Sequence, residues 1–151
     1  MTRLVTAIWE DDVQGVLRAL KSGYLLEQWV DERPVCRAEP THYFDGTACT
    51  ALGWAVSSWC SPMLIWFLVA GGACVDAPCA IIHDPLWCES PREMLLRVQL
   101  EFAKDSSGVL RAASMQRWGR APTEQWFQEV LDIFDGRRKW PQNDEVATAT
   151  N

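Results

Sequence analysis

Four residues with metal-binding side chains lie close together in the middle of the chain. Cys74, Cys79, His83 and Cys88 form the pattern C-x4-C-x3-H-x4-C within 15 residues. Zinc accepts three thiolates and one imidazole in tetrahedral structural sites. Such sites usually pair their ligands at C-x2–4-C spacing, however, and the x4 spacing found here is the wide end of that range. Free cysteines also behave as small hydrophobic residues, so buried or incidental thiols are the simpler interpretation. We therefore expect no metal and no other cofactor, with a structural zinc site as the alternative.

A cysteine nucleophile would need a histidine base within reach. The chain has two histidines, so Cys49 could pair with His42 and Cys79 with His83. Neither pair lies in a signature of a cysteine enzyme, and the partners in such enzymes are seldom sequence neighbours. The pattern therefore favours no nucleophilic chemistry.

Adjacent carboxylates occur at Glu10-Asp11-Asp12, Asp31-Glu32 and Asp144-Glu145. Neighbouring carboxylates in loops or at helix starts are usually solvated, or interact favourably with the helix dipole. Catalysis needs two carboxylates that face each other across a cleft, which adjacency does not provide. The sequence leans away from an enzyme.

The elements that would position these groups are mostly helical. Apolar spacing and end signals predict two short helices within residues 4–22, with an acidic cap between them. Ser90-Pro91-Arg92-Glu93 has the form of a capping box with proline at the first helical position. Further helices are expected over 50–58, 61–70, 90–104, 109–117 and 123–135, and irregular chain over 28–46 and 73–89.

The chain contains an internal repeat. Its unit consists of a short helix, a turn, a longer helix and a glycine, and it occurs twice. The spacing between equivalent residues is 48 positions for Ala7 and Ala55, and 49 for Gly23 and Gly72. Thr50-Ala51-Leu52-Gly53-Trp54-Ala55 resembles the ankyrin signature T-P-L-H-x-A, and residues 67–77 resemble the ankyrin ending L-L-x-x-G-A-D-V-N-A. Asp45-Gly46 resembles the turn that opens a repeat. Gly53 replaces the signature histidine, so its usual tie between neighbouring repeats is absent. The first unit resembles an N-terminal capping repeat, and a weaker third unit spans 90–136 with an insertion between its helices.

The resemblance implies an all-α fold: a short ankyrin-type solenoid of two to three degenerate helix-turn-helix repeats with a helical C-terminal cap. It also implies one domain over 1–140, followed by a flexible polar tail over 141–151. Helix pairs of this kind bury their apolar faces by stacking on one another.

The function implied is a non-enzymatic scaffold or adaptor that binds a protein partner on the concave face of the repeats. By resemblance, the contact residues on that face are Trp9, Glu10, Tyr43, Phe44, Asp45, Trp54, Ser57, Ser58 and Trp59. The alternative is a small-molecule binding protein or small enzyme, in which several of the nine tryptophans line a pocket with His42, Asp45 or Glu93.

Charge and hydrophobicity limit the class of partner and the cellular location that we expect. The net charge of −6 argues against nucleic acid and favours a protein partner with some basic surface. The longest apolar run, Met63–Ala73, is too short to span a bilayer, and no targeting segment is visible, so no membrane association is expected. A cytoplasmic or nuclear location is expected, where the six cysteines would be reduced.

Overall fold

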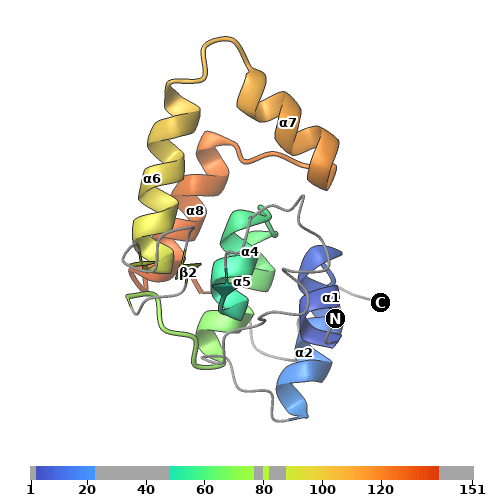
Figure 1. Cartoon of the computed structure of the whole chain (residues 1–151). Coiled ribbons are helices and arrows are strands. Elements are labelled where there is room, and N and C mark those ends of the chain that lie inside the picture. The colour runs from blue at the N-terminus through green and yellow to red at the C-terminus, as the bar shows by residue number, and fades with distance from the viewer. Residues whose placement is uncertain (1–2, 23–47, 77–79, 82–87, 140–151) are drawn as a thin grey trace.

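The chain folds mainly into helices (Figure 1). The computed structural model describes residues 3–22, 48–76, 80–81 and 88–139, and every structural statement below refers to these. The predicted polar tail over 141–151 lies outside them. The described helices are α1 (Arg3–Trp9), α2 (Val13–Lys21), α4 (Ala51–Ser57), α5 (Pro62–Ala70), α6 (Pro91–Ala103), α7 (Val109–Trp118) and α8 (Glu124–Phe134).

Most of these helices begin where the sequence predicts. In each case the side-chain oxygen of the cap residue accepts a hydrogen bond from the backbone N–H three positions later, which satisfies one of the free donors of the first turn. The caps are Asp12, Thr50, Ser61, Ser90 and Thr123. At Ser90 the capping box is complete, because the Glu93 carboxylate accepts from the Ser90 N–H at 2.9 Å.

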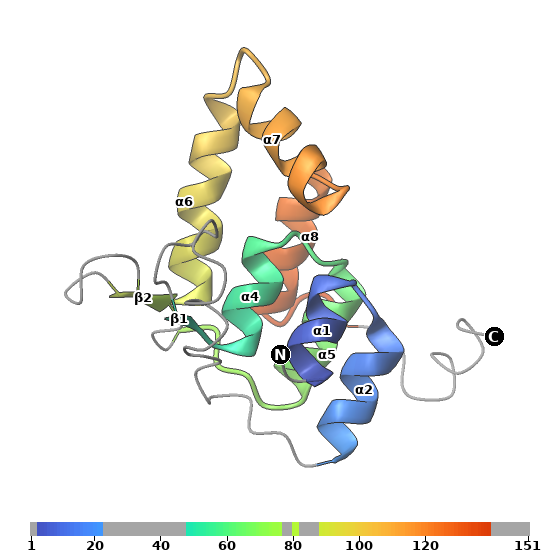
Figure 2. The same ribbon diagram turned by 45° about the vertical axis from the view of Figure 1, so that its right-hand side comes forward.

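The helices form three pairs stacked side by side. α1 packs on α2, α4 on α5, and α6 on α8. The first helices of the pairs contact one another in the order α1, α4, α6, and the second helices in the order α2, α5, α8 (Figures 1 and 2). The predicted third unit therefore exists as a helix pair, with α7 inserted between its two helices.

The central pair has no charged side chain, since residues 46–75 contain no Asp, Glu, Lys or Arg. α4 contacts α1 on one side and α6 on the other, and α5 lies between α2 and α8. A pair covered on both sides leaves charged groups little access to water, and burying them would be costly. Its largest fully buried side chains are Leu52, Trp54, Val56, Leu64, Ile65 and Leu68.

A small antiparallel sheet joins the central and third pairs; two of its strands lie in the stretch 73–89, where the sequence predicts irregular chain, and the third lies just before the predicted cap Thr50. Its strands are β1 (Ala48–Cys49), β2 (Ala80–Ile81) and β3 (Cys88–Glu89), in the order β1-β2-β3. Strands of two residues are too short to show the alternation that identifies a strand in a sequence. β1 runs directly into the cap of α4 and β3 into the cap of α6, so the sheet joins the N-terminal ends of these two helices.

α7 stands apart from the stack. Together with the C-terminal end of α6 it projects beyond the three pairs (Figures 1 and 2). Gly108 and Gly119 bound this helix with φ angles of 77° and 74°, a left-handed conformation that glycine adopts without steric cost. No described helix has both the length and the apolar character needed to cross a bilayer.

Candidate partner-binding surface

Two of the predicted contact residues are buried, which corrects their assignment. Trp54 is 2% exposed and Ser58 is 0% exposed, so neither can touch a partner. The indole of Trp54 lies in the core with its ring centroid 6.0 Å from that of Trp9. The Ser58 hydroxyl donates to the backbone carbonyl of Trp54 at 2.8 Å. Three other predicted residues, Tyr43, Phe44 and Asp45, lie outside the described residues.

The remaining four predicted residues lie at the turns inside the first two helix pairs. Trp9 and Ser57 are the last residues of α1 and α4, and Glu10 and Trp59 follow in the turns. Glu10 is exposed, while Trp9, Ser57 and Trp59 are half-buried. The indole N–H groups of Trp9 and Trp59 are buried and have no hydrogen-bond acceptor among the described residues.

The chain itself covers the aromatic surface at these turns. The Trp118 ring, at the end of α7, packs edge-on against Trp9 with centroids 4.7 Å apart. Phe102 of α6 and Trp126 of α8 contact Trp59 at 5.4 and 5.7 Å. Trp9 and Trp59, which were predicted to contact a partner, therefore pack against side chains of α6, α7 and α8.

Arg120 fastens the segment after α7 to the same turns. Its guanidinium donates to the carbonyl oxygens of Ser58 at 2.8 Å, Trp59 at 3.1 Å and Trp9 at 3.4 Å. These carbonyls follow the last turns of α1 and α4, where the helix dipoles concentrate partial negative charge. One cation thus satisfies carbonyl groups from two helix pairs and links both to the third.

The two turns are also tied to each other. The Asp11 carboxylate accepts from the Ser61 backbone N–H at 2.9 Å and from the Ser61 hydroxyl at 3.1 Å. The Cys60 thiol donates to the Ile8 carbonyl at 3.1 Å. These bonds link the first two helix pairs at the turn end.

Groups that could do chemistry have structural roles here. Burial raises the pKa of the Cys60 thiol to about 12, so it stays protonated and is a poor nucleophile. Asp11 and Asp12, from the acidic run, bind a neighbouring turn and cap α2. Within the described ranges, no three His, Cys, Asp or Glu side chains lie close enough together to hold a metal ion. Of the candidate nucleophile and zinc residues, Cys79, His42 and His83 lie outside those ranges.

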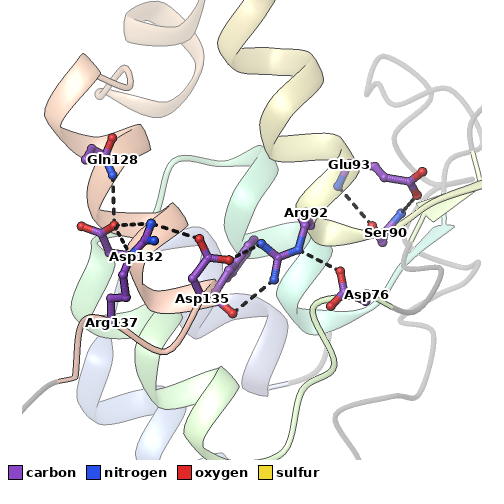
Figure 3. A network of polar contacts seen from close by, with 9 residues as sticks. Asp76, Ser90, Arg92, Glu93, Gln128, Asp132, Asp135 and Arg137 are labelled. Atoms are coloured by element: carbon purple, nitrogen blue, oxygen red, sulfur yellow. Dashed lines mark hydrogen bonds and ion pairs between the residues drawn. The ribbon is translucent and has the colours of Figure 1, made fainter.

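A charged network closes the opposite end of the third pair (Figure 3). Arg92, at the start of α6, donates to the Asp76 carboxylate at 2.8 Å and to the Asp135 carboxylate at 2.6 Å. These hydrogen bonds raise the pKa of Arg92. Because Asp76 follows α5 and Asp135 ends α8, this arginine joins the second pair to the third, which is a structural role.

The exposed apolar side chains point to a different surface. Leu96 and Leu100 of α6 are 43% and 62% exposed. Val109, Leu110 and Met115 of α7 are 65%, 38% and 50% exposed. These five are all the large exposed hydrophobic residues in the described part of the chain, and they lie within 20 consecutive positions. We call them the α6–α7 arm surface.

Sequence reasoning missed the arm surface, although α6 carries a usable signal. Leu95, Val98 and Phe102 form one apolar stripe at helical spacing, which faces the core. Leu96 and Leu100 form a second stripe four residues apart, which is exposed and does not pack in the core.

Comparisons with known protein families, with curated proteins and with solved structures find nothing that matches this chain.

Proposed function

We propose that this chain is a protein-binding scaffold of three ankyrin-type helix pairs, and that its partner binds the α6–α7 arm surface. Two features support the ankyrin-type architecture. The residues that resemble the ankyrin signature begin at the cap of α4, and those that resemble the ankyrin ending close α5. The first helices stack in one layer and the second helices in another, as in a solenoid of repeats.

The observation that carries the proposal is the grouping of exposed apolar side chains on the arm. Single exposed leucines are normal on a soluble protein, but here all the large exposed apolar side chains of the described residues are concentrated on one projecting element, which makes it a candidate interaction site. Met115 has a flexible, unbranched side chain that can adapt to a partner's shape. The binding surface thus moves from the concave face predicted by resemblance to the arm.

The small-molecule alternative has less support. The tryptophans Trp9, Trp59 and Trp126 pack against other aromatic rings. Among the polar groups suggested for a pocket, Glu93 closes the capping box of α6, and His42 and Asp45 lie outside the described residues. Among the described residues, no contact brings these tryptophans and Glu93 together to line one pocket.

A site-specific photocrosslinker tests the scaffold function. The photoreactive amino acid replaces Leu100 in one variant and the exposed, polar Gln128 of α8 in a matched control. Both variants are irradiated in cells that normally produce the protein. We expect a discrete heavier adduct from position 100 and none from position 128. Absence of an adduct from position 100 and from a second arm position, 115, would overturn the proposal.

A further inference from the structure

A short segment at the end of α7 covers the turns of the first two helix pairs. It consists of Trp118, Gly119 and Arg120, and we call it the latch. The Trp118 ring packs edge-on against the ring of Trp9, with the centroids 4.7 Å apart. The Arg120 guanidinium donates to backbone carbonyls of both turns. The latch thus occupies a surface that two helix pairs form together.

The surface under the latch suits a guanidinium group. The acceptors of Arg120 are the carbonyl oxygens of Ser58 at 2.8 Å, Trp59 at 3.1 Å and Trp9 at 3.4 Å. Ser58 contributes only its carbonyl oxygen, which Arg120 covers in the closed form. A guanidinium reaches several acceptors through a planar fork of N–H groups, whereas lysine has one compact ammonium. The surface therefore favours an arginine side chain over a lysine.

Little buried surface holds the latch against these turns. α7, which leads into the latch, buries only Ser114. A second hold on α7 comes from Arg111, which lies over the Phe102 ring and donates to the Pro122 carbonyl. Segments with few buried apolar contacts open at a lower free-energy cost than the core does. The latch can therefore leave the turns while the stack stays folded.

The closed latch leaves a hydrogen-bond donor unsatisfied. The Trp9 indole N–H is buried and has no acceptor among the described residues. Trp118 contacts the Trp9 ring but accepts no hydrogen bond from it. A buried donor without an acceptor costs free energy. A segment that supplied a carbonyl oxygen at this point would make a bond that the latch does not make.

The surroundings of the latch are acidic. Residues 4–17 and 46–75, which contain the two turns, include three carboxylates and no lysine or arginine. The Glu10 side chain, next to Trp9 in the chain, is exposed. A basic segment from another protein would therefore meet a favourable charge here as well as the turn carbonyls.

We propose that the latch is an internal occupant of a partner-binding surface, and that a partner protein displaces it with an arginine of its own. The partner segment would carry an aromatic residue two positions before the arginine, as the latch does. Its arginine would replace Arg120 at the turn carbonyls, and its aromatic ring would replace Trp118 on Trp9. Because this surface shares no residue with the α6–α7 arm surface, binding here does not depend on binding at the arm.

The latch competes with such a partner at a high effective concentration, because it belongs to the same chain. A partner must therefore gain contacts that the latch lacks. The Glu10 carboxylate and the Trp9 indole N–H supply two of them.

A peptide copy of the latch tests whether the surface accepts an external segment. The probe has the sequence of residues 113–122, and two control peptides carry glutamine or lysine at the position of Arg120. Fluorescence anisotropy of the labelled peptides measures binding. The proteins are the unmodified chain, a Trp118→Ala/Arg120→Ala variant without latch side chains, Gly119→Ala and Gly136→Ala. Circular dichroism checks that each variant is folded.

We expect the probe to bind the Trp118→Ala/Arg120→Ala variant at least about ten-fold more tightly than the unmodified protein, whose own latch must leave first. Gly119→Ala keeps the latch side chains and the net charge. Its Cβ would meet no atom within 4 Å, so it disfavours the closed latch only through the φ of 74° and should tighten binding roughly five-fold.

Gly136→Ala is the matched control, because it introduces the same kind of strain after α8, at a φ of 76°, and should leave binding unchanged. The glutamine peptide should bind about ten-fold more weakly than the probe, since it lacks the charged donor. The lysine peptide should fall between the two.

Absence of binding to the folded latch variants would overturn the inference, because the latch would then be a permanent structural contact. Equal binding to the unmodified protein and to Gly119→Ala would place the peptide elsewhere, and equal binding of the glutamine peptide would show that arginine is not selected. Each of these results also overturns it. If the double variant does not fold, the comparison of Gly119→Ala with Gly136→Ala decides. None of these outcomes changes the crosslinking result at position 100, so the two proposals fail separately.

Discussion

α5 and α7 are helices of similar length with opposite environments. α5 has nine residues, of which Leu64, Ile65, Phe67 and Leu68 are buried. α7 has ten residues, and its only buried one is Ser114. α5 packs against α2, α4 and α8, whereas α7 has no comparably extensive contact with any described helix.

The difference separates a helix that stabilises the stack from one that, under the proposed function, binds a partner. The apolar residues of α5 are removed from water by neighbouring helices, and that burial stabilises the stack. The large apolar residues of α7 remain exposed. The helix is held by Trp118 on Trp9 and Arg120 on the turn carbonyls near its C-terminal end, and by Arg111 on Phe102 and on the Pro122 carbonyl near its start. Substitutions in the stack should therefore change stability, and substitutions on the arm should change binding.

The largest effect is expected at Trp54, in the centre of the stack. Trp54→Ala removes a fully buried indole and should lower the free energy of unfolding by about 3–5 kcal/mol. Urea unfolding followed by circular dichroism measures this loss. Trp66→Ala makes the same chemical change at a half-buried site of α5 and should cost clearly less. Equal losses at the two sites would contradict the contrast between buried and exposed positions.

A smaller effect is expected at Arg120, which joins the two regions. Arg120→Met leaves the carbonyls of Ser58, Trp59 and Trp9 without their donor and should cost about 1–3 kcal/mol. Amide hydrogen exchange should become faster in α7 and change little in α5. Arg18→Met is the matched control on an exposed helix face. Unchanged exchange in α7 would mean that Arg120 does not hold the arm.

The buried thiol in the turn predicts a dependence on pH. The folded state raises the pKa of Cys60 from its ordinary value of 9.0 to about 12, mainly through burial. The folded protein therefore holds this proton more tightly than the unfolded chain. The stabilisation is complete below pH 9 and is lost as the pH rises from 9 to 12.

Between pH 8 and 10 this loss is on the order of 1 kcal/mol. Urea unfolding at both pH values measures it, with Cys60→Ala and the exposed Cys74→Ala compared with the unmodified protein. Cys60→Ala should lack this part of the decline, and Cys74→Ala should retain it. If all three proteins decline equally, the thiol of Cys60 titrates as in water.

Helix positions could be predicted because their signals are local. Thr50, Ser61-Pro62 and Ser90 mark helix starts through bonds made within three residues, and the structure confirms each of them. β1, β2 and β3 could not be predicted, since two-residue strands are too short to show alternation, and β1 pairs with β2 across more than 30 positions. The third helix pair was the weakest prediction because α7 separates its two helices in the sequence.

Contact residues were harder to predict than elements. Trp54 was assigned to the surface by analogy, but it is 2% exposed and packs in the core beside Trp9. Trp9 and Trp59 were predicted to contact a partner, and no local signal indicated that Trp118 and Phe102 would pack against them. Covering of this kind depends on tertiary contacts between distant segments.

The smallest effect on stability is expected on the arm itself. Leu100 is 62% exposed, so Leu100→Gln should change the free energy of unfolding by no more than about 0.5 kcal/mol. Leu95→Gln is the matched control on the same helix, where the side chain is 0% exposed, and it should destabilise the protein severely because it buries an amide in the core. Urea unfolding compares the two variants.

The same Leu100→Gln substitution, made in the variant that carries the photoreactive amino acid at position 115, should remove the crosslinked adduct, since Leu100 belongs to the same proposed surface. A stable variant that no longer binds would show that Leu100 is exposed for a partner. If the substitution instead costs more than about 1 kcal/mol, Leu100 packs within the folded chain, and its apolar side chain is needed for stability. The arm would then be part of the stack, and the contrast between α5 and α7 would be one of degree.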